Sequence, residues 1–235
     1  MLKERPYYSP GTASAAFYDL VAAADPVVAD DVDLYAGLLQ PGGSVLELGA
    51  GTGRISAALA RRNFHVVGLE LEAEMLARAQ RPPGVSLSYV LGDMRAFDLG
   101  LTFDAVICPY NALAHLPPTE WPAVFRCVAS HLTIGGIAAF HMPIEDQMAA
   151  PGPPVGSLVF QAKEPPLQIY MAGKQFEGGR MDLILDYATP TDVRRERLTY
   201  FSGNPDAAAN SAGLTRNIEP TLLGKAGLLY AYSKR

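Results

Sequence analysis

The residues with the clearest chemical meaning form a glycine-rich turn, Gly49-x-Gly51-x-Gly53, directly after an apolar run. Glycine lets the backbone approach a ligand closely, and free N–H groups at the start of a following helix favour an anion. Nicotinamide enzymes space these glycines G-x-G-x-x-G to seat a pyrophosphate. Here the last glycine is one position closer, and Glu47 precedes the turn. A carboxylate there would repel a pyrophosphate and suit a positively charged ligand, so the pattern favours a cationic cofactor.

Acidic and thioether side chains at the ends of the next two apolar runs suit a nucleoside. Glu70 follows Gly53 by 17 residues, where a carboxylate can accept hydrogen bonds from both hydroxyls of a ribose. Asp93, in Gly92-Asp93-Met94, could accept from the exocyclic amine of adenine. Met75 and Met94 could enclose the ring with polarizable thioethers.

Candidates for proton transfer come from histidine and tyrosine. His115, just beyond a fourth apolar run, is the favoured proton acceptor, and the competing interpretation is that it begins or caps the next helix. His141 is a weaker candidate, better explained as a hydrogen-bonded structural imidazole. Tyr18 is the second catalytic candidate. Together with Tyr8 and Tyr110 it could roof an acceptor pocket, although ordinary packing explains any single tyrosine.

Alternating strand-length and helix-length segments position these residues. From residue 44 to residue 142 the pattern predicts a parallel sheet with crossover helices, a doubly wound α/β fold. The predicted strands are Ser44–Leu48, Val66–Glu70, Ser86–Val90, Asp104–Cys108 and Ile137–His141, and the predicted helices include Ala73–Gln80 and Glu120–His131. The carboxyl ends of such strands converge on one crevice, where these folds bind ligands.

The order and spacing of these motifs resemble the class I S-adenosylmethionine-dependent methyltransferases over residues 44–142 and the closing strands. The segments that carry the resemblance are Val45–Gly53, Gly68–Glu70 with Glu74–Leu76, Gly92–Met94, Phe103–Cys108 and Leu132–Gly136. The resemblance implies a Rossmann-like seven-stranded sheet, mostly parallel, with an antiparallel last strand. It implies S-adenosyl-L-methionine as methyl donor and S-adenosyl-L-homocysteine as product. The cofactor-binding residues it indicates are Glu47, Gly49, Gly51, Gly53, Glu70, Leu71, Met75, Asp93, Met94 and Pro109.

The flanking segments predict three further parts. Residues 1–43 should form a helical cap with helices at Ala13–Ala24 and Asp30–Leu39, and Pro143–Pro154 reads as a connection. Alternation with period two and a Gly178-Gly179 turn predict an antiparallel insertion at 156–203. The Rossmann-like domain would then comprise 44–155 and 204–235, the latter with a helix at Asp206–Ser211 and strands at Thr215–Glu219 and Leu228–Tyr232.

The methyl acceptor is predicted to be a small molecule. The implied reaction is an in-line displacement by a nitrogen or an oxygen. Cys108-Pro109-Tyr110 lacks the Asn/Asp-Pro-Pro-Tyr motif of nucleic-acid and glutamine methyltransferases. The insertion resembles those of sugar and natural-product enzymes, where it walls the acceptor site or forms a dimer contact. Arg195, Arg197 and Tyr200 could contact the acceptor, but a solvated strand face is the favoured interpretation.

Composition bounds these predictions. The chain of 235 residues is 49% hydrophobic and 18% charged, which fits one large folded domain, with or without an elaboration. Nineteen Lys and Arg against 24 Asp and Glu give a net charge of −5, which disfavours a nucleic-acid partner. No apolar run approaches the roughly 18 residues that span a bilayer, and the start does not resemble a secretory signal, so a cytoplasmic protein is expected. No Cys/His or acidic cluster suggests a metal.

Two alternatives remain open at this point. One is a protein that binds S-adenosylmethionine without transferring a methyl group. The other is an NAD-dependent dehydrogenase, disfavoured by the glycine spacing and by Glu47.

Overall fold

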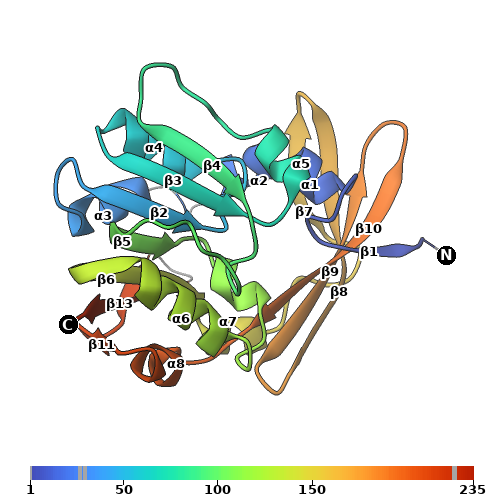
Figure 1. Ribbon diagram of the computed structural model, residues 1–235. Helices are drawn as coiled ribbons and strands as arrows, with labels where there is room; N and C mark the ends of the chain where they lie inside the picture. The colour runs from blue at the N-terminus through green and yellow to red at the C-terminus, as the bar shows by residue number, and fades with distance from the viewer. Residues whose placement is uncertain (1, 26–27, 29–30, 224–226) are drawn as a thin grey trace.

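The computed structural model describes residues 2–25, 28, 31–223 and 227–235. Its larger sheet has eight strands in the order β11-β13-β6-β5-β2-β3-β4, with β12 paired to β13 outside this path (Figure 1). The five parallel strands are β2 (Ser44–Leu48), β3 (His65–Glu70), β4 (Leu87–Leu91), β5 (Phe103–Cys108) and β6 (Leu132–Pro143). Antiparallel strands complete one edge: β11 (Leu214–Arg216), β12 (Thr221–Leu223) and β13 (Gly227–Lys234).

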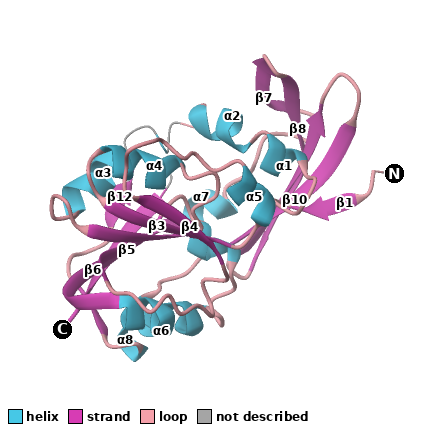
Figure 2. Ribbon diagram, turned by 45° about the horizontal axis from the view of Figure 1, so that its top comes forward, coloured by secondary structure: helices cyan, strands magenta, loops and turns pink. Residues whose placement is uncertain are grey.

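Helices cover both faces of this sheet, as side-chain alternation along the strands requires. On one face Leu46 and Leu48 of β2 pack in a core with the aromatic residues of α6 (Trp121–His131) and the alanines of α8 (Asp206–Ser211). On the other face Val45 packs with α3 (Asp31–Leu38) and α4 (Arg54–Arg61). The short helix α5 (Ala73–Ala77) follows β3. Figure 2 shows α3 and α4 on the opposite side of the sheet from α6 and α8.

A second sheet of five strands, in the order β1-β10-β9-β8-β7, stands beside the first (Figure 1). Its strands are β1 (Glu4–Pro6), β7 (Leu158–Lys163), β8 (Pro166–Glu177), β9 (Arg180–Ala188) and β10 (Val193–Phe201). The pairs β7–β8, β8–β9 and β9–β10 are antiparallel, and β1 is parallel to β10. The helices α1 (Ala13–Ala16) and α2 (Tyr18–Ala23) belong to the N-terminal segment, which packs with Leu167, Ile169 and Tyr187.

The structure departs from the expected elements in the N-terminal segment. The expected helix Ala13–Ala24 is interrupted at Phe17, whose φ of −113° and ψ of 15° are not helical. Phe17 packs against the core on the second sheet. The segment is also not purely helical, because β1 joins that sheet. Asp30, the expected start of the next helix, lies outside the described residues.

The C-terminal elements differ as well. The expected seven strands are one too few, because Thr221–Leu223 adds a short strand whose Leu222 is exposed, so no alternation marked it. The expected strand Thr215–Glu219 is shorter and earlier, at Leu214–Arg216. Strand β6 continues to Pro143, and the following connection contains α7 (Glu145–Ala149).

Candidate functional site

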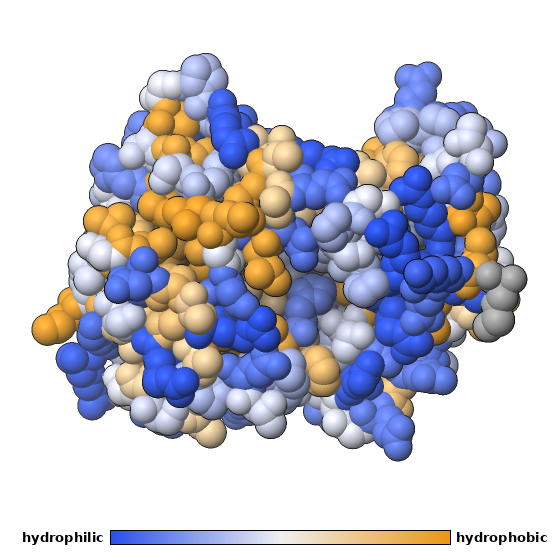
Figure 3. Space-filling model, turned by 45° about the vertical axis from the view of Figure 1, so that its right-hand side comes forward, coloured by the Kyte–Doolittle hydropathy of each residue, from blue (hydrophilic) through white to orange (hydrophobic). Residues whose placement is uncertain are grey.

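A cavity of about 350 Å³ lies at the carboxyl ends of β2, β3, β4 and β5. Glu70, Asp93 and Pro109 line one side of it, and residues of the N-terminal segment and of β10 line the other. Figure 3 shows the molecule from this side, hollowed between the larger sheet with its helices and the second sheet. We call this hollow the first cavity. Crevices at the carboxyl ends of parallel strands are where doubly wound folds bind ligands.

The glycine turn adopts the backbone conformation that only glycine takes without strain. Gly49, Gly51 and Gly53 have φ of +70°, +56° and +75°. Gly49 and Gly51 line the first cavity, and a Cβ on Gly49 would lie 2.7 Å from Ala112 Cβ. Gly53 is not among the lining residues. It caps α4, and a Cβ there would collide with the Tyr89 hydroxyl.

Glu70 lies where the glycine turn meets the first cavity. Its Oε2 accepts a hydrogen bond from the Gly51 N–H and its Oε1 accepts one from the Glu72 N–H, both at 2.8 Å. Burial raises the pKa of Glu70, and the backbone N–H donors oppose that shift. The carboxylate is therefore fixed in orientation and still has lone pairs for a ligand, because each oxygen can accept more than one hydrogen bond.

The remaining predicted nucleoside residues also line the first cavity: Leu71, Met75, Asp93, Met94 and Pro109. Met75 is buried, whereas Leu71 is exposed. The Asp93 carboxylate is held by Arg95, whose Nε lies 2.9 Å from Oδ1 and 3.0 Å from Oδ2. Hydrogen bonds from this guanidinium lower the pKa of Asp93. Sequence reasoning did not include Arg95, which also pairs with Glu120.

Glu47 does not occupy the position expected from the sequence. It is buried, is absent from the residues that line the first cavity, and accepts a hydrogen bond from the Ser56 hydroxyl of α4. Burial raises its pKa to about 8. On strand β2, Glu47 shares a face with Val45, which packs toward α4. The structure therefore does not agree with the prediction that the Glu47 carboxylate faces a cationic ligand in the first cavity.

His115 ends a single 3₁₀ turn, Ala112–His115, and lines the first cavity. Its ring lies 4.7 Å from the Tyr200 ring and 5.9 Å from the Tyr8 ring, measured between centroids. Burial lowers the pKa of His115 to about 4, against a smaller opposing effect of a hydrogen bond to the Thr199 backbone. A backbone hydrogen bond raises the pKa of an imidazole when the ring donates it to a carbonyl oxygen. One ring nitrogen of His115 therefore donates to the Thr199 carbonyl. The other nitrogen of the neutral ring can accept a proton or a hydrogen bond.

Tyrosines surround His115. Tyr8 and Tyr18 pack edge to face with centroids 5.6 Å apart, and Tyr8 has a φ of +59°. The Tyr110 hydroxyl donates to Asp25 Oδ2 at 2.6 Å. Burial raises the pKa of Tyr8 and of Tyr18 well above the usual range. Tyr8, Tyr18 and Tyr110 all line the first cavity, as does Tyr7, which sequence reasoning missed.

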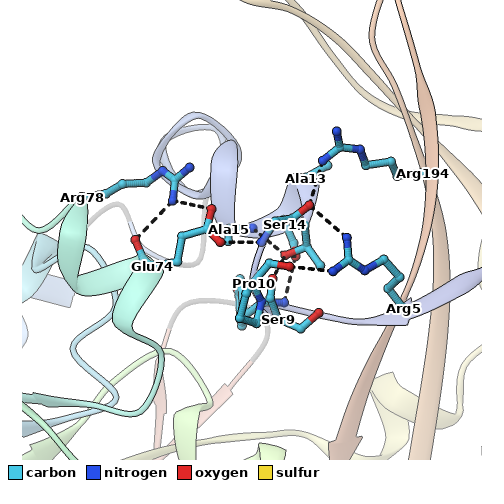
Figure 4. Close-up of polar contacts among 12 residues, drawn as sticks. Arg5, Ser9, Pro10, Ala13, Ser14, Ala15, Glu74, Arg78 and Arg194 are labelled. Carbon is cyan, nitrogen blue, oxygen red and sulfur yellow. Dashed lines mark hydrogen bonds and ion pairs between the residues drawn. The ribbon is translucent and has the colours of Figure 1, made fainter.

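The N-terminal segment is fastened on both sides by polar contacts, which Figure 4 shows. The Gly11 N–H donates to Glu74 Oε2 of α5 at 2.5 Å, and Arg78 holds the other oxygen of Glu74 at 2.8 Å. The Gly11 carbonyl accepts from Arg5 at 3.2 Å and from Arg194 of β10 at 2.8 Å. We call residues 5–14 the N-terminal clamp. It bridges α5 and the second sheet across one side of the first cavity.

A buried carboxylate of the second sheet also fixes the clamp. Glu196 Oε1 accepts from the Ala13 N–H at 2.6 Å, and Oε2 accepts from the Ser14 N–H at 3.1 Å. No sequence motif marked Glu196 or Glu74 for this role, since each acts on a segment distant in the chain. The only available signal for Glu196 was its position on the apolar face of a predicted strand.

Other candidate residues lie elsewhere. His141 is buried within β6, outside the lining of the first cavity, and its Nε2 has no partner among the described residues. Arg195 pairs with Asp186 and is not a lining residue, whereas Arg197 lines the cavity while paired with Glu4 and Asp182.

In the part of the chain that is described, no three His, Cys, Asp or Glu side chains gather closely enough to hold a metal ion. Within the same residues, no helix has the length and apolar character needed to cross a membrane.

Comparisons with known proteins agree with this geometry. The family described as "Methyltransferase domain" matches residues 45–136. The dTDP-3-amino-3,6-dideoxy-alpha-D-glucopyranose N,N-dimethyltransferase of Streptomyces fradiae is 40% identical over 96 residues, 40% of this chain and 37% of that protein. The dTDP-3-amino-3,4,6-trideoxy-alpha-D-glucopyranose N,N-dimethyltransferase of Streptomyces venezuelae is 34% identical over 110 residues, 46% of each protein. The matched region thus spans less than half of either relative.

Solved structures match nearly the whole chain. CalS10, an amino pentose methyltransferase from Micromonospora echinaspora, is 26% identical with a TM-score of 0.72, and the match covers 99% of this chain and 100% of CalS10. Streptomyces venezuelae DesVI is 25% identical with a TM-score of 0.73 over 95% and 99% of the two chains. The CcbJ methyltransferase from Streptomyces caelestis, 22% identical, shares the fold with a TM-score of 0.79 over 99% and 100%. Residues 45–136 of this chain therefore resemble a methyltransferase domain, and nearly the whole chain shares its fold with CalS10, DesVI and CcbJ.

Proposed function

We propose that this protein transfers a methyl group from S-adenosylmethionine to the amine nitrogen of an amino sugar. The observation that carries the proposal is that one cavity joins two chemically different sides. Glu70 and the glycine turn form the cofactor side, and His115 with its tyrosines forms the acceptor side. The names of the relatives, two sugar N,N-dimethyltransferases and an amino pentose methyltransferase, favour nitrogen over oxygen.

The residues of the cofactor side fit S-adenosylmethionine. Gly49 and Gly51 line the cavity with backbone alone, and a Cβ is excluded at Gly49 by Ala112 and strained at Gly51 by its φ of +56°. We assign the ribose hydroxyls to Glu70, the adenine to Met94 and Asp93, and the methionine part to the glycine turn. Glu47 and Gly53 support the turn from behind. The bound cofactor supplies an electrophilic methyl group on a positively charged sulfur.

The acceptor side suits an amine better than a hydroxyl group. A neutral amine attacks with its own lone pair, whereas a hydroxyl needs a base to remove its proton. With a pKa of about 4, His115 is a weak base that is fully neutral at pH 7. The free ring nitrogen of His115 can orient the amine by accepting a hydrogen bond from it. After the methyl group has been transferred, the same nitrogen can accept the proton that the methylated amine releases and pass it onward. Holding the nitrogen in line with the methyl group supplies most of the rate, an effect worth up to about 7–11 kcal/mol.

The second sheet walls the acceptor side in this proposal. Thr199 and Arg197 of β10 line the first cavity, and Thr199 fixes the His115 ring. The same proposal divides the chain into three parts with different roles. They are an N-terminal part (1–43), a Rossmann-like domain (44–155 and 204–235) and an inserted sheet (156–203). A dimer contact through the inserted sheet stays a prediction.

Calorimetry and methyl transfer test the proposal. S-adenosylmethionine and S-adenosylhomocysteine should bind, and NAD should not. Labelled methyl should pass to dTDP-3-amino-3,6-dideoxyglucose or a simple glycoside of the same amino sugar, and the matching 3-hydroxy sugars should remain unlabelled. Binding of the cofactor without transfer to any of these sugars would favour a binding protein, and labelling of the hydroxyl sugars would refute the choice of nitrogen.

A further inference from the structure

A second cavity of about 330 Å³ opens against the second sheet, beside the first. Methionines and aliphatic side chains dominate its lining: Met148, Met171, Met181, Leu183 and Ile144. Met181 and Leu183 alternate on β9 and so share one face of the sheet. The helices α1 and α2 pack against another part of this sheet, at Leu167 and Ile169, and α7 contributes Met148 here. This volume lies within the range of small-molecule sites.

Only a thin wall separates the two cavities. Tyr200 lines the second cavity, and its ring lies 4.7 Å from the ring of His115, which lines the first. Asn111 lines the second cavity, while its neighbours Tyr110 and Ala112 line the first. The second cavity therefore lies across the Tyr200 ring from His115, and a ligand that reaches both cavities must pass this ring or Asn111.

The side chain of Asn111 adds a polar group at the boundary of the two cavities. Its Oδ1 is buried and makes no hydrogen bond with the described residues. A buried amide without a partner costs free energy unless something else satisfies it. The backbone of Asn111 is left-handed, with φ of +62°, so its side chain is placed by a tight turn rather than by a helix or strand. A hydroxyl of a sugar could satisfy this amide at the boundary of the two cavities.

The two arginines along the first cavity are already engaged in ion pairs. Among the described lining residues of both cavities the cations are Arg95, Arg197 and Lys174. Arg95 pairs with Asp93 and Glu120, and Arg197 pairs with Glu4 and Asp182. The Lys174 ammonium donates to the Ala150 carbonyl at 2.5 Å. A diphosphate is bound best by guanidinium or ammonium groups that are not already in ion pairs; the described lining of the first cavity offers none, and that of the second offers Lys174 alone.

We propose that the second cavity binds an apolar aglycone attached to the amino sugar, so that the acceptor is an amino-sugar glycoside rather than a nucleoside diphosphate sugar. This inference rests on the proposed function for its sugar amine. Flexible methionine side chains fit apolar groups of varied shape, which suits an aglycone. The sugar then lies at Asn111 and Tyr200, with its amine toward His115.

Three probes test this substrate class: the octyl glycoside, the methyl glycoside and the dTDP derivative of 3-amino-3,6-dideoxyglucose. We expect kcat/KM for the octyl glycoside to exceed that of the methyl glycoside at least tenfold, because the longer chain buries several more methylenes. The dTDP sugar should not exceed the methyl glycoside. Equal values for the two glycosides, or a preference for the dTDP sugar, would overturn the inference and leave the proposed methyl transfer intact.

Substitutions locate the effect. Met181→Trp should fill the second cavity and reduce the octyl-to-methyl ratio toward one. Val159→Trp places the same side chain on an exposed part of β7, away from both cavities, and should keep the wild-type ratio. A ratio unaffected by Met181→Trp in a folded protein, judged by its melting temperature, would refute the assignment of the aglycone to this cavity.

Direct binding keeps the inference separate from the proposed function. Calorimetry with the octyl and methyl glycosides needs no turnover and can be made with or without S-adenosylhomocysteine. Tighter binding of the octyl glycoside, abolished by Met181→Trp, supports the second cavity even if methyl transfer fails. Absence of cofactor binding would instead count against the proposed function alone.

Discussion

The two sides of the first cavity are built in different ways. The cofactor side comes from the ends of four consecutive parallel strands within residues 44–109, so each of its groups follows its own strand. The acceptor side combines the N-terminal clamp, the turn at His115 and strand β10, which are far apart in the chain. In the proposed function a widely used cofactor is thus bound by local motifs, whereas the acceptor is bound by parts that can change without disturbing those motifs.

The two sides also differ in charge. The cofactor side carries the Glu70 and Asp93 carboxylates, and Asp93 is kept ionised by Arg95. On the acceptor side burial raises the pKa of Tyr7 to about 12 and lowers that of His115 to about 4, so both are neutral at pH 7. In the proposed function a positively charged donor therefore meets carboxylates, while an amine that must stay unprotonated to react meets uncharged groups.

The largest effect should come from His115→Ala. If His115 orients the acceptor and takes its proton, kcat should fall about 10²- to 10⁴-fold while the affinity for S-adenosylhomocysteine stays unchanged. Methyl-transfer kinetics and calorimetry on the same preparation separate the two quantities. A loss of cofactor affinity equal to the loss of rate would remove the distinction between the two sides.

The pH dependence sharpens the same test. His115 must be unprotonated to accept a hydrogen bond or proton, and its pKa is about 4. Its contribution to the rate should therefore be constant from pH 8 to pH 5 and decline as the pH falls through 4. The depressed pKa also predicts that its contribution to folding stability is present above pH 6.5 and is lost as the pH falls toward 4. A wild-type to His115→Ala rate ratio that halves near pH 6.5 would contradict the buried, neutral imidazole.

The opposite pattern is expected for Glu70→Ala. Removal of this carboxylate should weaken S-adenosylhomocysteine binding by about 1.5–3 kcal/mol for each ribose hydrogen bond lost. Calorimetry measures the affinity, and kcat at saturating cofactor should change much less. Glu70→Gln is the matched control, because it keeps the shape of the side chain and one acceptor oxygen and should lie between wild type and Glu70→Ala. An unchanged affinity in Glu70→Ala would refute the ribose assignment.

A smaller effect is expected at the contact that joins the two sides. Glu74→Ala removes the acceptor for the Gly11 N–H and frees the N-terminal clamp from α5. We expect S-adenosylhomocysteine to dissociate about two- to tenfold faster, as for the loss of one hydrogen bond, because the clamp covers the cavity. Stopped-flow displacement measures this rate. Glu74→Gln retains an acceptor oxygen and should remain close to wild type, and equal rates in all three proteins would show that the clamp does not limit release.

The same division explains what the sequence could predict. Glu70, Met94 and the glycines of the turn follow strands whose apolar runs are visible locally, so their places at one sheet edge could be predicted. The direction in which the Glu47 side chain points was predicted wrongly. The alternation of side chains along a strand could have shown it, because Val45 and Glu47 lie on the same face of β2 and that face packs against α4. The doubly wound order of the sheet followed from the alternating pattern, and the short exposed strand β12 left no such pattern.

The acceptor side was only partly predictable. His115 and Tyr18 were candidates because of their residue type, but nothing local indicated that Thr199 would hold the His115 ring. Nor could Gly11 be connected with Glu74, since such contacts depend on how two sheets and a terminal segment pack. Long-range packing of this kind carries no periodic signal in the sequence.

The smallest effect is expected at Arg195, where two roles can be told apart. Residues alternate along β10, so Glu196 turns inward to the N-terminal clamp, and Arg195 forms two hydrogen bonds of 2.7 Å with Asp186 on the other face. Both partners are partly exposed, so Arg195→Ala should lower stability by at most about 1 kcal/mol. Denaturant unfolding measures this change, and kcat/KM for the methyl acceptor should equal that of wild type. A raised KM would place Arg195 among the groups that contact the acceptor, and the acceptor side would then extend along β10 from Thr199 and Arg197, which share its face of the strand, to Arg195.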